Sequence, residues 1–179
     1  MLQKEDCGLI VVDIQGSLAR IVQQSDLFID NTQKLIQCCQ LLSIPIILLE
    51  QNPKGLGPTV LEISELLTES VVNEKSHFNA LFEQSIKDAV KATDKKCWLV
   101  VGIEAHICVY QTVLGLLDED YKVAVVSDCI SSRLQSNIAL ALHNMRERGA
   151  SITSLEMCVF ELIKNAKSDS FKKILPIIK

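Results

Sequence analysis

Leu9-Ile-Val-Val-Asp13 is the stretch that decides the fold of this chain. An uninterrupted run of aliphatic, mostly β-branched residues is typical of a strand that is buried on both faces of a sheet. The run ends in Asp13, and an acid at the end of an apolar strand costs free energy to bury unless it is paired. We therefore expect Asp13 to lie at a functional edge of the sheet, although a structural acid that caps the loop 14–17 fits the same pattern.

Short apolar runs of this kind recur along the chain and alternate with segments in which apolar residues have helical spacing. Further strands are predicted at residues 44–49, 71–75, 97–101, 122–127 and 151–153. Helices are predicted at residues 25–42, 60–70, 82–93, 107–117, 155–163 and 171–178. Ser25-Asp26 is the expected start of the first of these helices. One more helix is expected to be capped by Ser131 or Ser132 and stopped by Gly149, with a core stripe of Leu134, Ile138, Leu142 and Met145.

Strands that alternate with helices predict right-handed βαβ units and a parallel sheet covered on both faces. The fold class is therefore α/β, a three-layer α/β/α sandwich with a mostly parallel, doubly wound sheet of about six strands. A length of 179 residues and the lack of a linker indicate one domain over 1–179. Ligands of such sheets bind beyond the carboxyl ends of the strands, where the strand order reverses. In the order 3-2-1-4-5, that point lies between the strands that lead to Asp13 and to Cys108.

Composition narrows the class of protein. The hydrophobic fraction is 48% with a formal charge of −4, and no apolar run is long enough to cross a bilayer. A basic stripe is missing, so we expect no nucleic acid and no membrane among the partners. The high hydrophobic fraction and the apolar helices at the end of the chain favour a homo-oligomer.

The seven cysteines are expected to be reduced thiols. Their number is odd, they form no Cys-x-x-Cys pair, and no histidine lies at ligand spacing from them, so no metal site is predicted. The first residues have neither the basic nor the apolar part of a signal peptide. We therefore expect a cytoplasmic protein. Neither a phosphate-binding glycine motif nor a Gly-x-Ser-x-Gly motif is present, so no nucleotide cofactor is expected and serine-hydrolase chemistry is disfavoured.

Cys108 is the candidate nucleophile. It follows the strand at 97–101 and falls in the first turn of the next helix, where free N–H groups and the helix dipole are expected to lower the pKa of a thiol. The alternative is a buried cysteine that packs the joint between strand and helix. Asp13, on the neighbouring strand end, provides the carboxylate that a nucleophilic thiol needs.

Lys75 and the histidines have weaker support from the residues alone. A lysine in Asn73-Glu-Lys-Ser76 is ordinarily a solvated surface residue. His106 lies near Cys108 and His77 near Lys75, so both are candidate substrate contacts, although a structural hydrogen bond is the commoner role. His143 falls on a helix and is expected at the surface. The glycine-rich loop 53–59 is interpreted as a lid, or else as a tight turn.

Three segments of the chain resemble the signature segments of the isochorismatase-like cysteine hydrolases, and in the same order. They are Val12-Asp-Ile-Gln15, a lysine followed by Phe78-Asn-Ala80, and Gly102-Ile-Glu-Ala-His-Ile-Cys-Val109. Other stretches are similar to the subgroup called isochorismatase domain-containing proteins: Glu50-Gln-Asn-Pro-Lys-Gly-Leu-Gly-Pro-Thr59, Gln111-Thr112, 128–133 and 153–156. The resemblance covers nearly the whole chain.

The resemblance implies a catalytic triad of Asp13, Lys75 and Cys108, with the aspartate as general base and the lysine supporting the thiolate. It also implies a cis peptide bond between Ile103 and Glu104, which would direct the N–H groups of Glu104 and Cys108 at an oxyanion. Gln15 and Gln51, which belong to the matching segments, join His77 and His106 as expected substrate contacts.

The implied reaction is acyl transfer to the thiol and hydrolysis of the thioester, with a small molecule containing an amide-type C–N bond as substrate. Isochorismatases proper do not use this cysteine. Nicotinamidases of the family bind a metal through an acid and histidines after the second strand, and Glu50-Gln-Asn52 departs from that pattern. We therefore expect no metal and no other cofactor. The competing hypothesis is a catalytically silent member that serves as an oligomeric binding or scaffold protein.

Overall fold

The computed structural model describes residues 1–179 and contains one sheet of six parallel strands. The strands lie in the order β3-β2-β1-β4-β5-β6, which is the doubly wound order expected from the sequence. Their bounds are β1 (Cys7–Val12), β2 (Ile46–Gln51), β3 (Val72–Lys75), β4 (Cys97–Gly102), β5 (Lys122–Ile130) and β6 (Ser151–Thr153). The predicted α/β class and strand number are confirmed.

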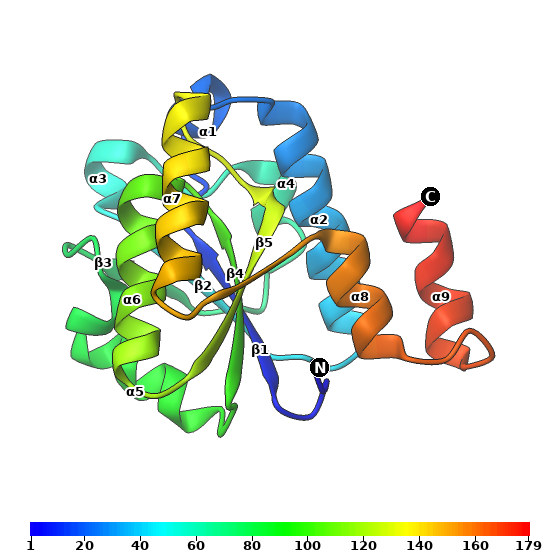
Figure 1. Ribbon diagram of the computed structural model, residues 1–179. Helices are drawn as coiled ribbons and strands as arrows, with labels where there is room; N and C mark the ends of the chain where they lie inside the picture. The colour runs from blue at the N-terminus through cyan, green and yellow to red at the C-terminus, as the bar shows by residue number, and fades with distance from the viewer.

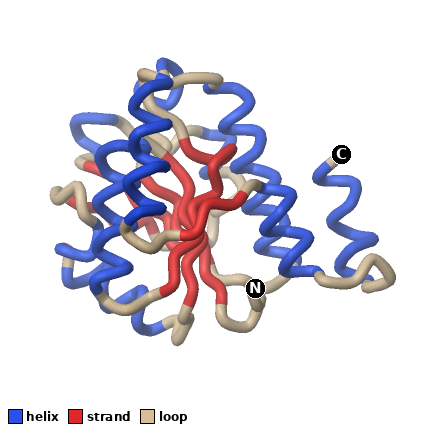
Figure 2. The backbone as a smooth tube through the Cα atoms, viewed as in Figure 1, coloured by secondary structure: helices blue, strands red, loops and turns tan.

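Helices cover both faces of this sheet, so the molecule has three layers (Figures 1 and 2). One face is covered by α2 (Ser25–Leu41), α8 (Leu155–Ile163) and α9 (Asp169–Ile178), and the other by α5 (Gln84–Ala92), α6 (Tyr110–Asp118) and α7 (Gln135–Glu147). Short helical turns complete the chain: α1 (Leu18–Ile21), α3 (Pro53–Leu56), α4 (Leu61–Ser64), η1 (Ala80–Phe82) and η2 (Ala105–Val109). Helix α9 is the outermost element on its side (Figure 1).

The alternation of side chains along the strands divides the core into two halves. In β1, Leu9 and Val11 pack on the side of α2 and α8, whereas Ile10 and Val12 pack on the side of α5, α6 and α7. Both sets are fully buried, as expected for a central parallel strand. The cysteines divide unevenly between the halves. Six of them lie in the first half, and Cys108 alone lies in the second.

The switch point of the sheet lies between β1 and β4. The two strands pair in parallel, with Val12 opposite Gly102. The chain leaves β1 toward α2 on one face and leaves β4 toward α6 on the other, so the two connections diverge at the carboxyl end of the sheet (Figure 1).

The beginnings of two helices differ from the prediction. Helix α2 starts at Ser25, but its side chain donates to Ala19 O at 2.7 Å and does not cap the helix. Ser131 and Ser132 do not cap α7 either, because their hydroxyl groups bind the carbonyl oxygen of Gln23 and the ring of His106. Leu134 precedes α7 and is 59% exposed, so it does not belong to the core stripe.

Two further features were not foreseen in detail. Strand β5 runs to Ile130, beyond the predicted end at 127, and its pairing with β4 shifts register between Val100 and Gly102. The loop 53–59 contains the short helix α3. An antiparallel bridge between Gln15 and Thr59 joins this loop to the segment that follows β1. No helix is long and apolar enough to span a bilayer.

Candidate active site

The backbone places Asp13 directly at the switch point. Asp13 is the residue after β1, and its φ of 53° lies in the left-handed region, which Asp adopts more readily than most residues. The neighbouring strand end approaches very closely. A Cβ built on Gly102 would lie 2.0 Å from Val12 O, and its φ is 120°, so only glycine fits there. Asp13 is 2% exposed.

Lys75 is the buried partner of Asp13, not the solvated surface residue that its sequence context suggests. It ends β3 opposite Gln51 of β2, and it is 3% exposed. Its Nζ donates to Asp13 Oδ2 at 2.7 Å, to Gln51 Oε1 at 2.7 Å and to the carbonyl oxygen of His77 at 3.4 Å. These three acceptors use all three donors of the ammonium group.

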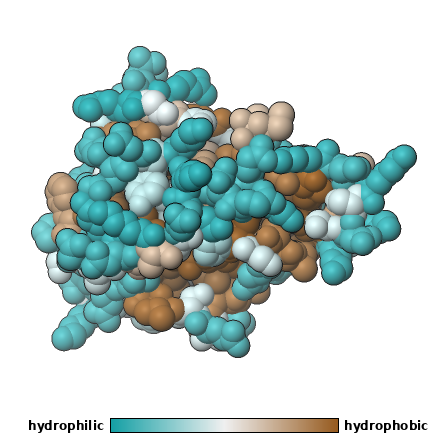
Figure 3. Space-filling model, turned by 90° about the horizontal axis from the view of Figure 1, so that it is seen from below, coloured by the Kyte–Doolittle hydropathy of each residue, from teal (hydrophilic) through white to brown (hydrophobic).

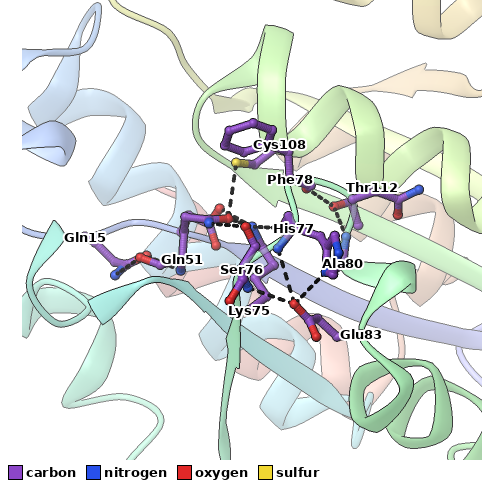
Figure 4. Close-up of polar contacts among 12 residues, drawn as sticks. Gln15, Gln51, Lys75, Ser76, His77, Phe78, Ala80, Glu83, Cys108 and Thr112 are labelled. Atoms are coloured by element: carbon purple, nitrogen blue, oxygen red, sulfur yellow. Dashed lines mark hydrogen bonds and ion pairs between the residues drawn. The ribbon is translucent and has the colours of Figure 1, made fainter. Parts of the chain in front are cut away.

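Cys108 lies on the other side of the same cluster. It belongs to η2, a single π-helical turn that connects β4 to α6. Its Sγ is 4.0 Å from Gln51 Oε1, and Figure 4 shows this contact beside the Lys75 side chain. The structure therefore brings Asp13, Lys75 and Cys108 together from three strand ends, as the resemblance implies.

The thiol of Cys108 is not pre-ionised, which corrects the expectation from its position in the first turn of a helix. Burial, followed by the charge of Asp13, raises the pKa of Cys108 to about 12, and Lys75 opposes this rise. The reason is that desolvation and a neighbouring carboxylate together outweigh the dipole of a short helical turn. At neutral pH the group is a thiol, so it needs a base before it can attack.

Asp13 is suited to be that base. Burial raises the pKa of its carboxyl group, while the charge and hydrogen bond of Lys75 and the nearby thiol of Cys108 lower it. Oδ2 receives Lys75, but Oδ1 has no hydrogen-bond partner although it is buried. A buried carboxylate oxygen without a donor is rare in native proteins, and this one is free to accept the proton of the thiol.

Glu104 provides both a backbone donor and a buried charge. The Ile103–Glu104 peptide bond is cis, and the N–H of Glu104 donates to no acceptor of the protein. The carboxylate accepts from the backbone N and the Nε of Arg133, both at 3.0 Å. Burial acts to raise the pKa of Glu104, but these contacts with Arg133 outweigh it and leave the pKa below its usual value.

The two glutamines have different positions. Gln51 lies in the cluster, where its Oε1 accepts from Lys75 and its Nε2 donates to Ser76 O at 2.8 Å. The amide of Gln15 faces the 51–57 segment instead. Its Oε1 accepts from Gln51 N at 2.7 Å and its Nε2 donates to Gly57 O at 2.7 Å. Gln15 is fully buried and its amide is hydrogen-bonded at both ends, so it holds the loop in place, and its contact with a substrate stays a prediction.

The rings of His77 and His106 both form hydrogen bonds with other side chains of the protein. His77 is an exposed residue whose Nδ1 is 2.9 Å from Glu83 Oε1, and only its carbonyl oxygen reaches Lys75. The ring of His106 lies between Ser132 Oγ at 3.0 Å and Asn137 Nδ2 at 3.2 Å. Both rings form the structural hydrogen bonds that are the commoner role of histidine, and their contact with a substrate stays a prediction.

Three residues near the site were missed because nothing local distinguishes them. Glu50 is buried and accepts from the N–H and the hydroxyl of Thr59, both at 2.6 Å. Thr112 of α6 binds Ala80 N at 3.2 Å and Phe78 O at 3.4 Å, which fixes the loop that carries the Phe78 ring toward Cys108 in Figure 4. Arg133 binds Glu104. The segments that carry Glu50, Thr112 and Arg133 resemble the isochorismatase domain-containing proteins, and this resemblance was the only signal in the sequence that could have singled out these residues.

A metal site is not formed by the side chains present, because no group of three or more His, Cys, Asp or Glu converges anywhere in the structure. All seven cysteines are free thiols.

Comparison with known proteins gives a consistent result. The sequence matches the isochorismatase domain over residues 7–157. It is 32% identical to isochorismatase domain-containing protein 2 of Danio rerio, over 95% of this chain and 85% of that protein. Among solved structures, the MAR1 ribonuclease of Caenorhabditis elegans superimposes with a TM-score of 0.92 at 32% identity, covering 99% of this chain and 91% of that one. The YcaC gene product of Escherichia coli, described as an octameric hydrolase of unknown specificity, gives a TM-score of 0.93 at 25% identity, covering 98% and 89%. This chain belongs to the isochorismatase-like hydrolase family.

Proposed function

We propose that the chain is a cysteine hydrolase that cleaves an amide-type C–N bond of a small molecule through Cys108. The observation that carries the proposal is a buried carboxylate next to the thiol of Cys108: Asp13 Oδ2 is held by Lys75, and Asp13 Oδ1 has no hydrogen-bond partner. A nucleophile, a base and a group that orients the base are the three parts that covalent catalysis requires.

In the proposed first step, Asp13 takes the proton of Cys108 as Sγ attacks the acyl carbon, because the thiol is protonated at neutral pH. Proton transfer and attack together avoid a free thiolate beside a carboxylate. The carbonyl oxygen becomes an oxyanion, and the N–H groups of Glu104 and Cys108 are its proposed donors. Asp13 then gives the proton to the departing amine, which leaves a thioester on Cys108.

In the second step, water attacks the thioester carbon with Asp13 as base. The C–S bond breaks, the sulfur takes up the proton, and the acid product is released. Lys75 keeps its position throughout, because its ammonium favours the charged form of Asp13 and offsets part of the penalty of burying that charge.

The test is turnover of an amide panel by the wild type, Cys108→Ala and a matched thiol control, Cys97→Ala. Cys97 and Cys108 are both buried to a similar degree, but Cys97 packs in the other half of the core. We expect hydrolysis to be lost only in Cys108→Ala, and a rapidly acidified reaction to show the acyl group on the peptide that contains Cys108. No hydrolysis in any of the three proteins would favour the silent binding or scaffold function, and equal activity in all three would exclude Cys108 as the nucleophile.

We also propose that the chain works as a homo-oligomer in the reducing environment of the cytoplasm. Seven free thiols fit that environment. Helix α8 exposes Met157 and Phe160, and apolar side chains extend across the centre and right of the face seen in Figure 3, the side on which α8 and α9 lie in Figure 1. Light scattering coupled to gel filtration should give a mass above that of one chain, and Met157→Lys should lower it.

A further inference from the structure

The buried charges around Cys108 do not balance. Three carboxylates are buried at this end of the sheet, on Asp13, Glu50 and Glu104. Lys75 pairs with Asp13, and Arg133 pairs with Glu104. Glu50 is left with the neutral donors of Thr59 and has no ion-pair partner. One net negative charge therefore remains inside the site.

The field of this charge reaches the reacting groups. Asp13 N donates to Leu49 O at 3.2 Å, so Asp13 lies beside the strand residue that precedes Glu50. Burial is the main cause that raises the pKa of Asp13, and the carboxylate of Glu50 adds a smaller rise. Both are nearly inaccessible to water, so solvent screens their fields less than it would at the surface.

Lys75 and Arg133, which pair with Asp13 and Glu104, are both already engaged with carboxylates of the protein. The Lys75 side chain is fully inaccessible, and its three donors are used by three protein acceptors. Arg133 is bound to the Glu104 carboxylate through its Nε and its backbone N–H. An anion that entered the site would have to displace one of these contacts.

The surface beside the site has the same charge bias. A hollow of about 260 Å³ adjoins Lys75 and is lined by two acids, Glu74 and Glu83, and by one exposed lysine, Lys54. Backbone N–H groups of Ser76 and His77 and the ring of His77 lower the pKa of Glu83 to about 2, so its charge persists over the whole physiological range. The side chains exposed in this hollow therefore carry one net negative charge next to Lys75, which disfavours an anion there.

We infer that the site selects substrates by charge: it accepts an acyl compound that carries no negative charge near the scissile bond and rejects carboxylates and phosphates. The inference rests on the proposed function for the role of Cys108, but the charge selection itself comes from the buried acids around the site.

The first test compares two alkylating reagents of nearly the same size, iodoacetamide and iodoacetate. The rate at which each modifies Cys108 is measured by peptide mass spectrometry and divided by its rate with free glutathione. A uniform change in thiol reactivity cancels in the ratio. One uncompensated charge roughly 10 Å away disfavours an anion by about tenfold at an effective dielectric constant near 20, so we expect about a tenfold preference for iodoacetamide. Equal normalised rates would overturn the inference.

A charge-removing variant makes the test specific. Glu50→Gln keeps an oxygen that can accept from Thr59 and removes the unpaired charge. We expect it to reduce the preference from about tenfold to about threefold or less. Glu119→Gln is the control, because Glu119 pairs with Lys87 and lies between the end of α6 and the start of β5, at the amino end of the strands. The control should keep the full preference, and a preference that is unchanged in Glu50→Gln would contradict the assignment of the charge.

The second test does not depend on a reactive thiol. Cys108→Ala is titrated with propionamide, propionate and inorganic phosphate, and binding is followed by chemical-shift changes in protein NMR spectra. We expect propionamide to bind at least tenfold more tightly than either anion. Propionamide that binds no better than propionate would overturn the charge selection. If Cys108 resists both alkylating reagents but this preference holds, the nucleophile proposal fails and the charge selection stands.

Discussion

Replacing Lys75 with methionine should make the stability of the protein depend on pH in a way that reveals the Asp13–Lys75 pair. Methionine has a similar length but no charge, so the variant leaves Asp13 buried at 2% exposure without its cation. The pKa of Asp13 is already raised by burial in the wild type, and Lys75 is the largest of the influences that lower it. Without Lys75, we expect Asp13 to stay protonated at neutral pH.

The loss in free energy of unfolding in Lys75→Met is set by the cost of keeping Asp13 protonated in the folded state. An unfolded aspartate has a pKa of about 3.9, and keeping it protonated in the folded state costs about 1.4 kcal/mol for each pH unit above that value. The ceiling on the loss in free energy of unfolding is therefore about 4 kcal/mol at pH 7 and about 1.5 kcal/mol at pH 5. The sign is fixed, because the folded pKa lies above the unfolded one: stability is present at low pH and is lost as pH rises.

Urea unfolding of the wild type and Lys75→Met at pH 5 and pH 7 measures the effect. Two further proteins give the comparison. Asp13→Asn in the Lys75→Met background removes the titrating group and should abolish the extra pH dependence. Lys34→Met breaks the more exposed ion pair with Asp30 and should change stability by less than about 1 kcal/mol at either pH. The reasoning is refuted if the loss in Lys75→Met is the same at both pH values, or if Asp13→Asn leaves the pH dependence in place.

Three more outcomes are expected from the geometry. The rate of iodoacetamide labelling at Cys108 should rise about tenfold per pH unit up to at least pH 9, because burial and Asp13 raise the pKa of the thiol to about 12. A plateau of the labelling rate near pH 7 would contradict this prediction. In Asp13→Asn amide hydrolysis should be lost in an assay of turnover, because the group that takes the thiol proton and returns it to the departing amine is gone, and retained turnover would contradict the role of Asp13. Gly102→Ala should lower the free energy of unfolding by more than about 3 kcal/mol in urea titrations, because its Cβ would lie 2.0 Å from Val12 O. Gly149→Ala is the control for backbone strain alone, since Gly149 also has a positive φ but no atom lies within 4 Å of its added Cβ.

The central strands of the sheet could be predicted from the sequence because they are continuous apolar runs. The run that ends in Asp13 appears as β1 over Cys7–Val12, and the run at 97–101 appears as β4 over Cys97–Gly102. Short or irregular parts were less predictable. Strand β5 continues through a shift in register, and no side-chain periodicity announces where such a shift will occur.

The candidate site could be predicted only in part, because its contacts join distant segments. Asp13 and Lys75 are 62 positions apart, and the burial of Lys75 depends on a four-residue strand whose sequence is mostly polar. Family resemblance, not local pattern, singled out this lysine. The pKa of Cys108 was predicted in the wrong direction, since the position in the first turn is visible in the sequence but the depth of burial and the closeness of Asp13 are not. The direction of the Gln15 amide could not be predicted either, because the fold of the 51–57 segment decides where it points.

The division of the thiols between the two halves of the core bears on damage by oxidants. Cys108 is the only cysteine on its side of the sheet, and the other six lie behind the β-strands. A peroxide that converts the Cys108 thiol to a sulfenic acid therefore creates a group with no resolving thiol within the same half of the core. The lesion cannot close into an internal disulfide, and its repair depends on a small external thiol that is able to enter the site.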